Sequence, residues 1–284
     1  MQKLFLILCV LLICLVLFNL SYFANSGILI AGLKKAKVIS HENLVLEKLK
    51  YKAGDPRNLS SLAIDFLYTK QESAQVVEKL KLHKDKWQRR NVAMSTMGTA
   101  SYLDGLNDYE KLSKKSNVFM SELFSDVHNK LLVYFQEKCP TAQIKYRQNA
   151  ALPGFHIFDC NNIFAMPVAS VHKDMQWNRL NYKNNENIDT KNTLSFTLAL
   201  ELPKGGGGLY TFEDDISSLI IPKPILNSLS KKHYIKYKVG YIVLHNGQTN
   251  HMIAPCQQSK DQYRITLQGH GVYEKNSKTW YLYW

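Results

Sequence analysis

The chain has 284 residues, of which 45% are hydrophobic and 21% are charged. This is the composition of a globular protein long enough to bury a substantial core, and it excludes a wholly disordered chain. The formal net charge of +13 favours acidic partners, but the basic residues are spread along the chain without a dense tract, which argues against nucleic-acid binding.

An uncharged apolar segment occupies residues 4–23. At a rise of about 1.5 Å per residue, twenty helical residues span about 30 Å, the thickness of the hydrocarbon core of a bilayer. The segment predicts a single-pass membrane anchor within residues 1–26 and therefore a membrane location. The alternative is a signal peptide cleaved near Ala24-Asn25-Ser26, which would give a secreted or lumenal protein. Lysines flank the segment on both sides, so the positive-inside rule assigns no orientation.

Residues 27–145 contain few glycines or prolines and show helical patterns. One apolar stripe recurs at three- and four-residue steps, which is typical of an amphipathic helix. Its members are Met120, Leu123, Val127, Leu131 and Tyr134. A more charged helix is expected over residues 74–90. We therefore predict a helical layer that supports the rest of the protein.

The pattern changes near Pro153-Gly154, after which short β-rich segments alternate with turn signals. The expected strands are at residues 155–158, 193–200, 241–244 and 264–267. Such a series without intervening helices is typical of a jelly roll. We predict an α+β protein whose mainly β core, residues 146–284, packs on the helical layer. The aromatic segment 280–284 is expected to pack on this core.

A His-x-Asp motif, His172-Lys173-Asp174, precedes the long strand expected at 193–200. On a strand, residues two apart point to the same face and can bind one ion, whereas on a helix they diverge. The motif also occurs at His83-Lys84-Asp85, within a charged helical stretch. We interpret that copy as a solvated helix face.

Further candidates follow the motif at 172 in chain order. His251 lies just beyond the strand expected at 241–244, and Arg264 and Thr266 share one face of the last expected strand. Gln176 lies two residues beyond Asp174 and is a candidate for the same pocket. We interpret His156 and His245 as structural histidines in its surroundings.

The order of these parts resembles a known family. His-x-Asp, a strand, a glycine-rich turn (Gly206–Leu209), a glycine-strand-histidine segment and Arg-x-Thr are similar to the iron(II)- and 2-oxoglutarate-dependent dioxygenases, most closely to the prolyl-4-hydroxylase-like branch. The resemblance covers about residues 150–284 and implies a double-stranded β-helix, which is a jelly roll with supporting helices. Residues 152–158 depart from the usual prolyl hydroxylase sequence, which leaves the substrate open.

The resemblance also implies roles for the candidate residues. His172, Asp174 and His251 would hold Fe²⁺ and leave three coordination positions open. Arg264 would pair with the distal carboxylate of the cosubstrate 2-oxoglutarate, and Thr266 would add a hydroxyl donor. The reaction would consume O₂, decarboxylate 2-oxoglutarate to succinate and hydroxylate an unidentified protein or small-molecule substrate, for example a peptidyl proline. Ascorbate is a further candidate cofactor.

Three other functions compete with this one. A nucleic-acid demethylase of the same family would resemble an Arg-x₅-Arg pattern, but His270 stands six residues after Arg264. A zinc hydrolase could use the same two histidines and carboxylate, but nothing in its chemistry requires Arg264. The third alternative is a membrane-anchored jelly-roll module that binds a partner through a non-catalytic site.

Overall fold

The computed structural model describes most of the chain beyond the N-terminal region. The described residues are 37–39, 59–60, 62–91, 93–105, 107–160, 171–180, 187–204, 207–212, 232–255 and 262–284. The apolar segment 4–23 and the cleavage site near Ala24 lie outside them, so the membrane anchor and the signal peptide both remain predictions. No helix within the described ranges is long and apolar enough to cross a membrane.

The described strands form two sheets. The spatial order of the larger sheet is β2 (Ala63–Phe66), β10 (Tyr241–Asn246), β7 (Ile188–Glu201), β12 (Tyr263–Glu274), β6 (Gly154–Asp159), β4 (Met94–Met97) and β3 (Gln88–Arg89). Two further strands extend it beside β12, namely β13 (Thr279–Tyr283) and β5 (Gln143–Tyr146). The order of the smaller sheet is β1 (Lys37–Ile39), β9 (Lys232–Lys236), β8 (Gly208–Phe212) and β11 (His251–Ala254).

Two α-helices, α3 (Lys70–Leu82) and α4 (Tyr109–Lys138), precede most of these strands. A capping box fixes the start of α3, because the Thr69 hydroxyl accepts the Glu72 N–H at 3.1 Å and the Glu72 carboxylate accepts the Thr69 N–H at 2.7 Å. Short 3₁₀ helices lie at Lys84–Lys86 and Gln176–Arg179. The predicted apolar stripe lies on α4, with Met120, Val127 and Leu131 buried.

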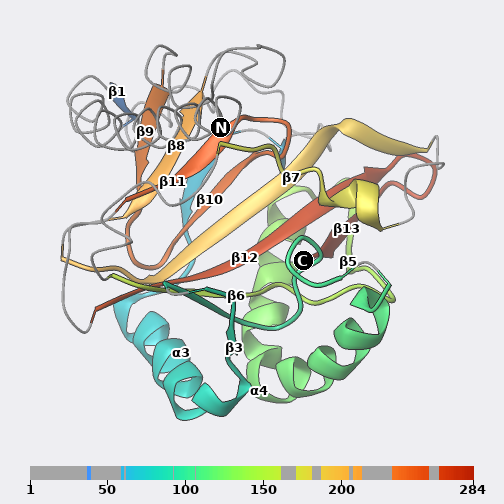
Figure 1. Cartoon of the computed structure of the whole chain (residues 1–284). Helices are drawn as coiled ribbons and strands as arrows, with labels where there is room; N and C mark the ends of the chain where they lie inside the picture. The colour runs from blue at the N-terminus through green and yellow to red at the C-terminus, as the bar shows by residue number, and fades with distance from the viewer. Residues whose placement is uncertain are drawn as a thin grey trace, which may run out of the picture.

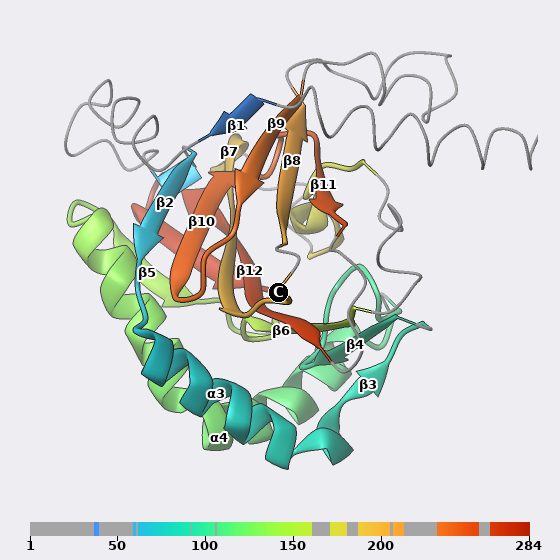
Figure 2. The same ribbon diagram turned by 90° about the vertical axis from the view of Figure 1, so that its left-hand side faces the viewer.

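The layers follow from the alternation of side chains along the central strands. In β7, Leu194, Phe196, Leu198 and Leu200 belong to the core cluster that also contains side chains of α3 and α4. The residues between them face the smaller sheet, where Ala199 packs with side chains of β2, β8, β9 and β10. Figures 1 and 2 show both helices on one side of the large sheet and the small sheet on the other. The mainly β architecture expected from the sequence is therefore present, and it agrees with a jelly-roll core.

Helices α3 and α4 lie in the region expected to form the helical layer, but this region also contains strands. Strands β2, β3 and β4 lie in this region and pair with the core, β2 with β10 and β4 with β6. The helix expected over 74–90 also ends earlier, at Leu82, and the chain re-enters the sheet at Gln88. These short strands have a weak sequence signal because their conformation is set by the sheet edges that they join.

The aromatic segment at 280–284 packs in the core as expected. It forms most of β13, and both Trp280 and Trp284 are fully buried. The Trp284 ring lies against Gly154, where any side chain would overlap it. Close approach of a large ring to the backbone explains why a glycine stands at the start of β6.

Candidate metal centre

The backbone brings His172 and His251 together. They lie opposite each other in an isolated antiparallel bridge, and each N–H donates to the other's carbonyl, at 3.0 Å and 2.9 Å. Directly opposed residues point their side chains to the same face of the pair. The two ring centroids are accordingly 4.4 Å apart, although the residues are far apart in sequence.

The chain around Asp174 is held in place by Gly247. The Asp174 N–H donates to the Gly247 carbonyl at 2.7 Å, and a Cβ on Gly247 would come within 2.9 Å of the Asp174 carbonyl oxygen. The His-x-Asp motif does not lie on a regular strand, since residues 173–175 have no strand structure. The side chains nevertheless converge, because a loop held by Gly247 turns the carboxylate toward the bridge.

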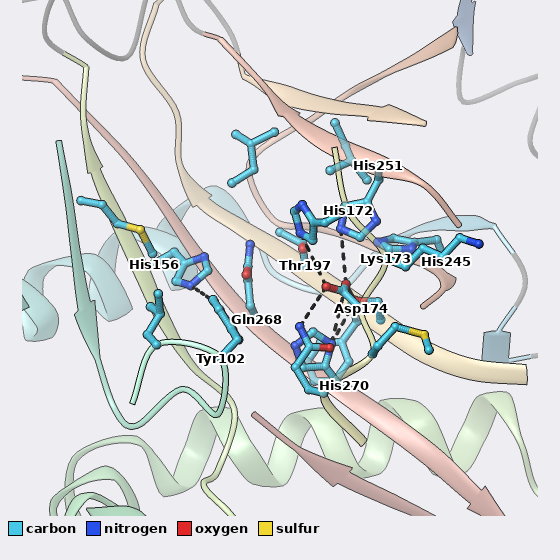
Figure 3. A pocket seen from close by; sticks show the side chains of 18 of the residues that line it. Tyr102, His156, His172, Lys173, Asp174, Thr197, His245, His251, Gln268 and His270 are labelled. Atoms are coloured by element: carbon cyan, nitrogen blue, oxygen red, sulfur yellow. Dashed lines mark hydrogen bonds and ion pairs between the residues drawn. The ribbon is translucent and has the colours of Figure 1, made fainter. Parts of the chain in front are cut away.

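The three side chains form one cluster (Figure 3). His172 Nε2 lies 3.7 Å from Asp174 Oδ1, and His251 Nε2 lies 3.4 Å from Asp174 Oδ2. One ligand atom from each residue fits within 4.8 Å of the others, a separation that a single metal ion can bridge. The structure thus brings together the residues that the sequence proposed as metal ligands.

The protonation of the cluster suits a divalent cation. The Thr249 carbonyl lies 2.9 Å from His251 Nδ1, so Nδ1 carries the hydrogen and Nε2 presents its lone pair toward Asp174. Burial, only partly opposed by attraction to Asp174, lowers the pKa of His251 to about 3, so its ring is neutral at pH 7. Burial alone would raise the pKa of Asp174, but attraction to His251 and the other imidazoles outweighs it and lowers that pKa. Two imidazole nitrogens and one carboxylate oxygen form a donor set that fits Fe²⁺ and also Zn²⁺.

The cluster lies in the wall of a cavity of about 580 Å³ between the two sheets. The lining includes one acidic residue, Asp174, and two basic residues, Lys173 and Arg179, and much of the remaining lining is apolar. The apolar part of the lining consists of Ala93, Met94, Leu103, Phe158, Met175, Phe196, Leu209 and Ile253. Asp174 is only 7% exposed, whereas the His172 side chain is 42% exposed.

Arg264 and Thr266 share the inner face of β12, as predicted, and both are fully buried. Neither lines the cavity. The Arg264 Cζ lies 5.4 Å from the ring centroid of Phe158, which lines the cavity, and 5.2 Å from the ring centroid of Tyr237. After burial, the charge of Arg264 is the largest cause that lowers the pKa of the cavity residue His156, so its field reaches the cavity. The Thr266 hydroxyl is buried without a hydrogen-bond partner among the described residues.

Gln176 lies in the cavity as predicted, and its Nε2 donates to Asp174 Oδ1 at 3.1 Å. The histidines interpreted as structural, His156 and His245, also line the cavity. The His245 ring centroid lies 4.6 Å from that of His251. The second His-x-Asp motif lies at the surface after α3, where Asp85 is exposed, so its interpretation as a solvated feature is confirmed.

Several lining residues were missed by sequence reasoning. Gln268 and His270 continue the inner face of β12 beyond Thr266, and strand alternation could have identified them. Ser195 of β7 is paired with His270 of β12 and lines the cavity with it. Tyr102 gave no sequence signal, because it comes from a loop; it lines the cavity and forms a hydrogen bond with His156. Figure 3 shows this pair on the opposite side of Gln268 from Asp174.

No family model matches the sequence, and no curated protein is similar to it. Among solved structures, the chain is similar to an N-substituted L-amino acid dioxygenase from Burkholderia ambifaria in complex with α-ketoglutarate. The sequence identity is 10%, the match covers 80% of this chain and 89% of that chain, and the TM-score is 0.48. It is also similar to an oxidoreductase of the 2OG-Fe(II) oxygenase family from Burkholderia pseudomallei, with 9% identity, 81% and 95% covered, and a TM-score of 0.43.

A third similar structure is a prolyl-4-hydroxylase from Pseudomonas putida, with 12% identity, 76% of this chain and 95% of that chain covered, and a TM-score of 0.35. Of these three structural neighbours, one is described as a member of the 2OG-Fe(II) oxygenase family, one as a dioxygenase in complex with α-ketoglutarate and one as a prolyl-4-hydroxylase. At these identities and TM-scores the likeness is remote.

Proposed function

We propose that this protein is an Fe²⁺- and 2-oxoglutarate-dependent oxygenase that hydroxylates its substrate. The observation that carries this proposal is the convergence of His172, Asp174 and His251, with ligand atoms within 4.8 Å, on the wall of a cavity. Two imidazoles and one carboxylate on one face, with no fourth residue of this group in the part of the chain that the structure describes, match the ligand set of non-haem Fe²⁺ oxygenases.

The three residues would hold the metal, and the bound iron would couple the decarboxylation of 2-oxoglutarate to the oxidation of the substrate by O₂. The carboxylate of Asp174 offsets part of the cation's charge. The hydrogen bond from His251 Nδ1 to the Thr249 carbonyl fixes the ring with Nε2 toward the metal. Burial of Asp174 and His251 keeps water away from this side of the site.

Arg264 and Thr266 are the proposed partners of the cosubstrate's distal carboxylate. Arg264 is fully buried, and a buried guanidinium interacts strongly with an anion because the surrounding dielectric is low. The Thr266 hydroxyl has no hydrogen-bond partner among the described residues, so it can donate to the same group. Phe158 lines the cavity and its ring centroid lies 5.4 Å from Arg264 Cζ, so Phe158 marks the end of the cavity at which this carboxylate would bind.

The substrate is proposed only as a class. A volume of about 580 Å³ lies within the usual range for small-molecule sites, and it accommodates 2-oxoglutarate together with a small molecule or one side chain such as a peptidyl proline. Ascorbate would serve as an accessory reductant. Location at a membrane, through residues 4–23, is part of the proposal and rests on the sequence alone.

The test is succinate formation by the full chain, purified in a mild detergent because of its apolar segment and supplied with Fe²⁺, 2-oxoglutarate and air. Succinate measured by NMR should appear in the unaltered protein and disappear in His172→Ala and Asp174→Ala. The matched controls are His83→Ala and Asp85→Ala, which remove the same residue types from the surface copy of the motif and should keep full activity.

Other outcomes would contradict the proposal. Loss of succinate in the His83→Ala control, or its survival in Asp174→Ala, would place the centre elsewhere. Binding of Zn²⁺ without any turnover of 2-oxoglutarate would favour the zinc hydrolase. Binding of no metal at all would favour the non-catalytic module.

A further inference from the structure

Three side chains form a row across the large sheet beneath Asp174. Ser195 of β7 is directly opposite His245 of β10 on one side and His270 of β12 on the other. All three line the cavity and are at most 5% exposed. Figure 3 shows His270 next to Asp174, on the side away from His172 and His251.

The hydrogen-bond chemistry of this row has one consistent assignment. The Ser195 hydroxyl donates to Asp174 Oδ2, since an ionised carboxylate can only accept. A hydroxyl has one hydrogen, so the contact of 3.2 Å between Ser195 Oγ and His270 Nδ1 requires that Nδ1 be the donor. His270 Nδ1 also lies 3.8 Å from Asp174 Oδ2. His270 therefore orients the hydroxyl, and the hydroxyl orients the carboxylate.

The other oxygen of the carboxylate is held separately. Gln176 Nε2 donates to Asp174 Oδ1 at 3.1 Å, and Gln176 is itself buried in the 3₁₀ helix that follows the motif. With one donor on each oxygen, the carboxylate cannot rotate about its Cβ–Cγ bond without losing a hydrogen bond. Each oxygen still has lone-pair capacity for a metal ion.

We propose that Ser195, oriented by His270 and assisted by Gln176, is the positioning residue that fixes the Asp174 carboxylate for metal binding. This inference rests on the proposed function, because it assigns a role toward the same metal. Hydrogen bonds to a metal-ligating carboxylate reduce the rearrangement needed on binding, and loss of such partners typically weakens metal affinity about 10- to 100-fold. Ser195 does not contact the substrate in this assignment and acts only through Asp174.

The test is a titration of the metal-free full chain with Co²⁺, a spectroscopic substitute for Fe²⁺, followed by its visible absorption. Ser195→Ala should raise the dissociation constant about 10- to 100-fold and change the absorption spectrum of the bound ion. Ser195→Thr keeps the hydroxyl and should restore both. His270→Asn, whose amide can replace the Nδ1–H donor, should bind Co²⁺ more tightly than His270→Leu.

The matched control is Ser116→Ala. Ser116 is a buried serine of α4 whose hydroxyl accepts a hydrogen bond of 2.9 Å from Thr99, and neither residue lines the cavity. This variant should bind Co²⁺ as the unaltered chain does. Circular dichroism and thermal unfolding of each variant identify any that fail to fold, and Ser195→Thr then decides the question.

Two failures are distinguishable. If the unaltered chain forms succinate and binds Co²⁺, but Ser195→Ala binds within about twofold of it, then only the positioning role is overturned. The same holds if Ser116→Ala loses as much affinity as Ser195→Ala. If the unaltered chain binds neither Co²⁺ nor Fe²⁺, the proposed function fails and this inference fails with it.

Discussion

The substitution Gly247→Ala tests whether the position of the Asp174 backbone determines metal binding. A Cβ at residue 247 would lie 2.6 Å from Thr193 Oγ1 and 2.9 Å from the Asp174 carbonyl oxygen, both closer than side-chain carbons ordinarily approach. To relieve these two close contacts, the loop that carries Asp174 would have to shift by several tenths of an ångström. We expect a loss of stability of about 1–3 kcal/mol, as for overpacked sites.

The substitution Gly247→Ala should also weaken metal binding, beyond its effect on the stability of the fold. Asp174 and Gly247 are joined by a backbone hydrogen bond of 2.7 Å, so any movement of residue 247 is transmitted to the carboxylate. We expect Co²⁺ affinity to drop about 10- to 100-fold, comparable to the loss of a partner of a ligating residue. The assays are Co²⁺ titration and thermal unfolding of the metal-free protein.

A second substitution separates the two contacts. In Gly247→Ala combined with Thr193→Ala, the hydroxyl contact is absent but the contact with the Asp174 carbonyl remains. Stability should partly recover, whereas metal affinity should not. The control is Gly105→Ala, because nothing lies within 4 Å of a Cβ there. Unchanged Co²⁺ affinity in Gly247→Ala would refute the view that this backbone contact positions Asp174.

Three further expectations follow from the same geometry. Arg264→Ala should raise the concentration of 2-oxoglutarate needed for half-maximal succinate formation about 10- to 150-fold, because a charge-assisted hydrogen bond is lost. The Co²⁺ affinity should change little. An unchanged 2-oxoglutarate requirement would exclude Arg264 as the carboxylate partner. Gly154→Ala should destabilise the fold by about 1–3 kcal/mol, because the added carbon overlaps the Trp284 ring, and an unaltered melting temperature would contradict this. Metal at a hundred times its dissociation constant should stabilise the unaltered chain by about 2.7 kcal/mol but leave Asp174→Ala unchanged, as thermal unfolding would show.

The central strands could be predicted from the sequence because alternation alone determines their two faces. In β12, Ile265 and Leu267 face the helices, while Arg264 and Thr266 face the interior between the sheets. The sequence pattern was sufficient to assign the two faces of β12, because a strand with one apolar face has only one register that buries that face. The same rule, carried two and four residues further, would have identified Gln268 and His270.

The sequence predicted that His172, Asp174 and His251 converge, and the structure brings these three side chains together. A bridge between His172 and His251 and a loop held by Gly247 achieve this, rather than a strand face shared by His172 and Asp174. Tyr102 could not have been predicted, because a loop position depends on tertiary contacts. Its loop is fixed by the Arg90–Asp104 ion pair, whose nearest atoms are 2.8 Å apart.

The short strands of residues 27–145 were missed for a related reason. β2 and β4 have four residues each, and their conformation is stabilised by pairing with β10 and β6 rather than by a local preference. The scarcity of glycine and proline in this region gave the impression of helix, although Gly98 directly follows β4. The partner strands β10 and β6 lie more than 50 residues away from β2 and β4 along the chain.

The most direct measurement is an anaerobic calorimetric titration of the metal-free full chain with Fe²⁺. We predict one ion bound per chain, loss of that binding in Asp174→Ala, and full binding in Asp85→Ala, which alters the surface copy of the motif. Undiminished binding in Asp174→Ala, or loss of binding in Asp85→Ala, would contradict the assignment of His172, Asp174 and His251 as the metal centre.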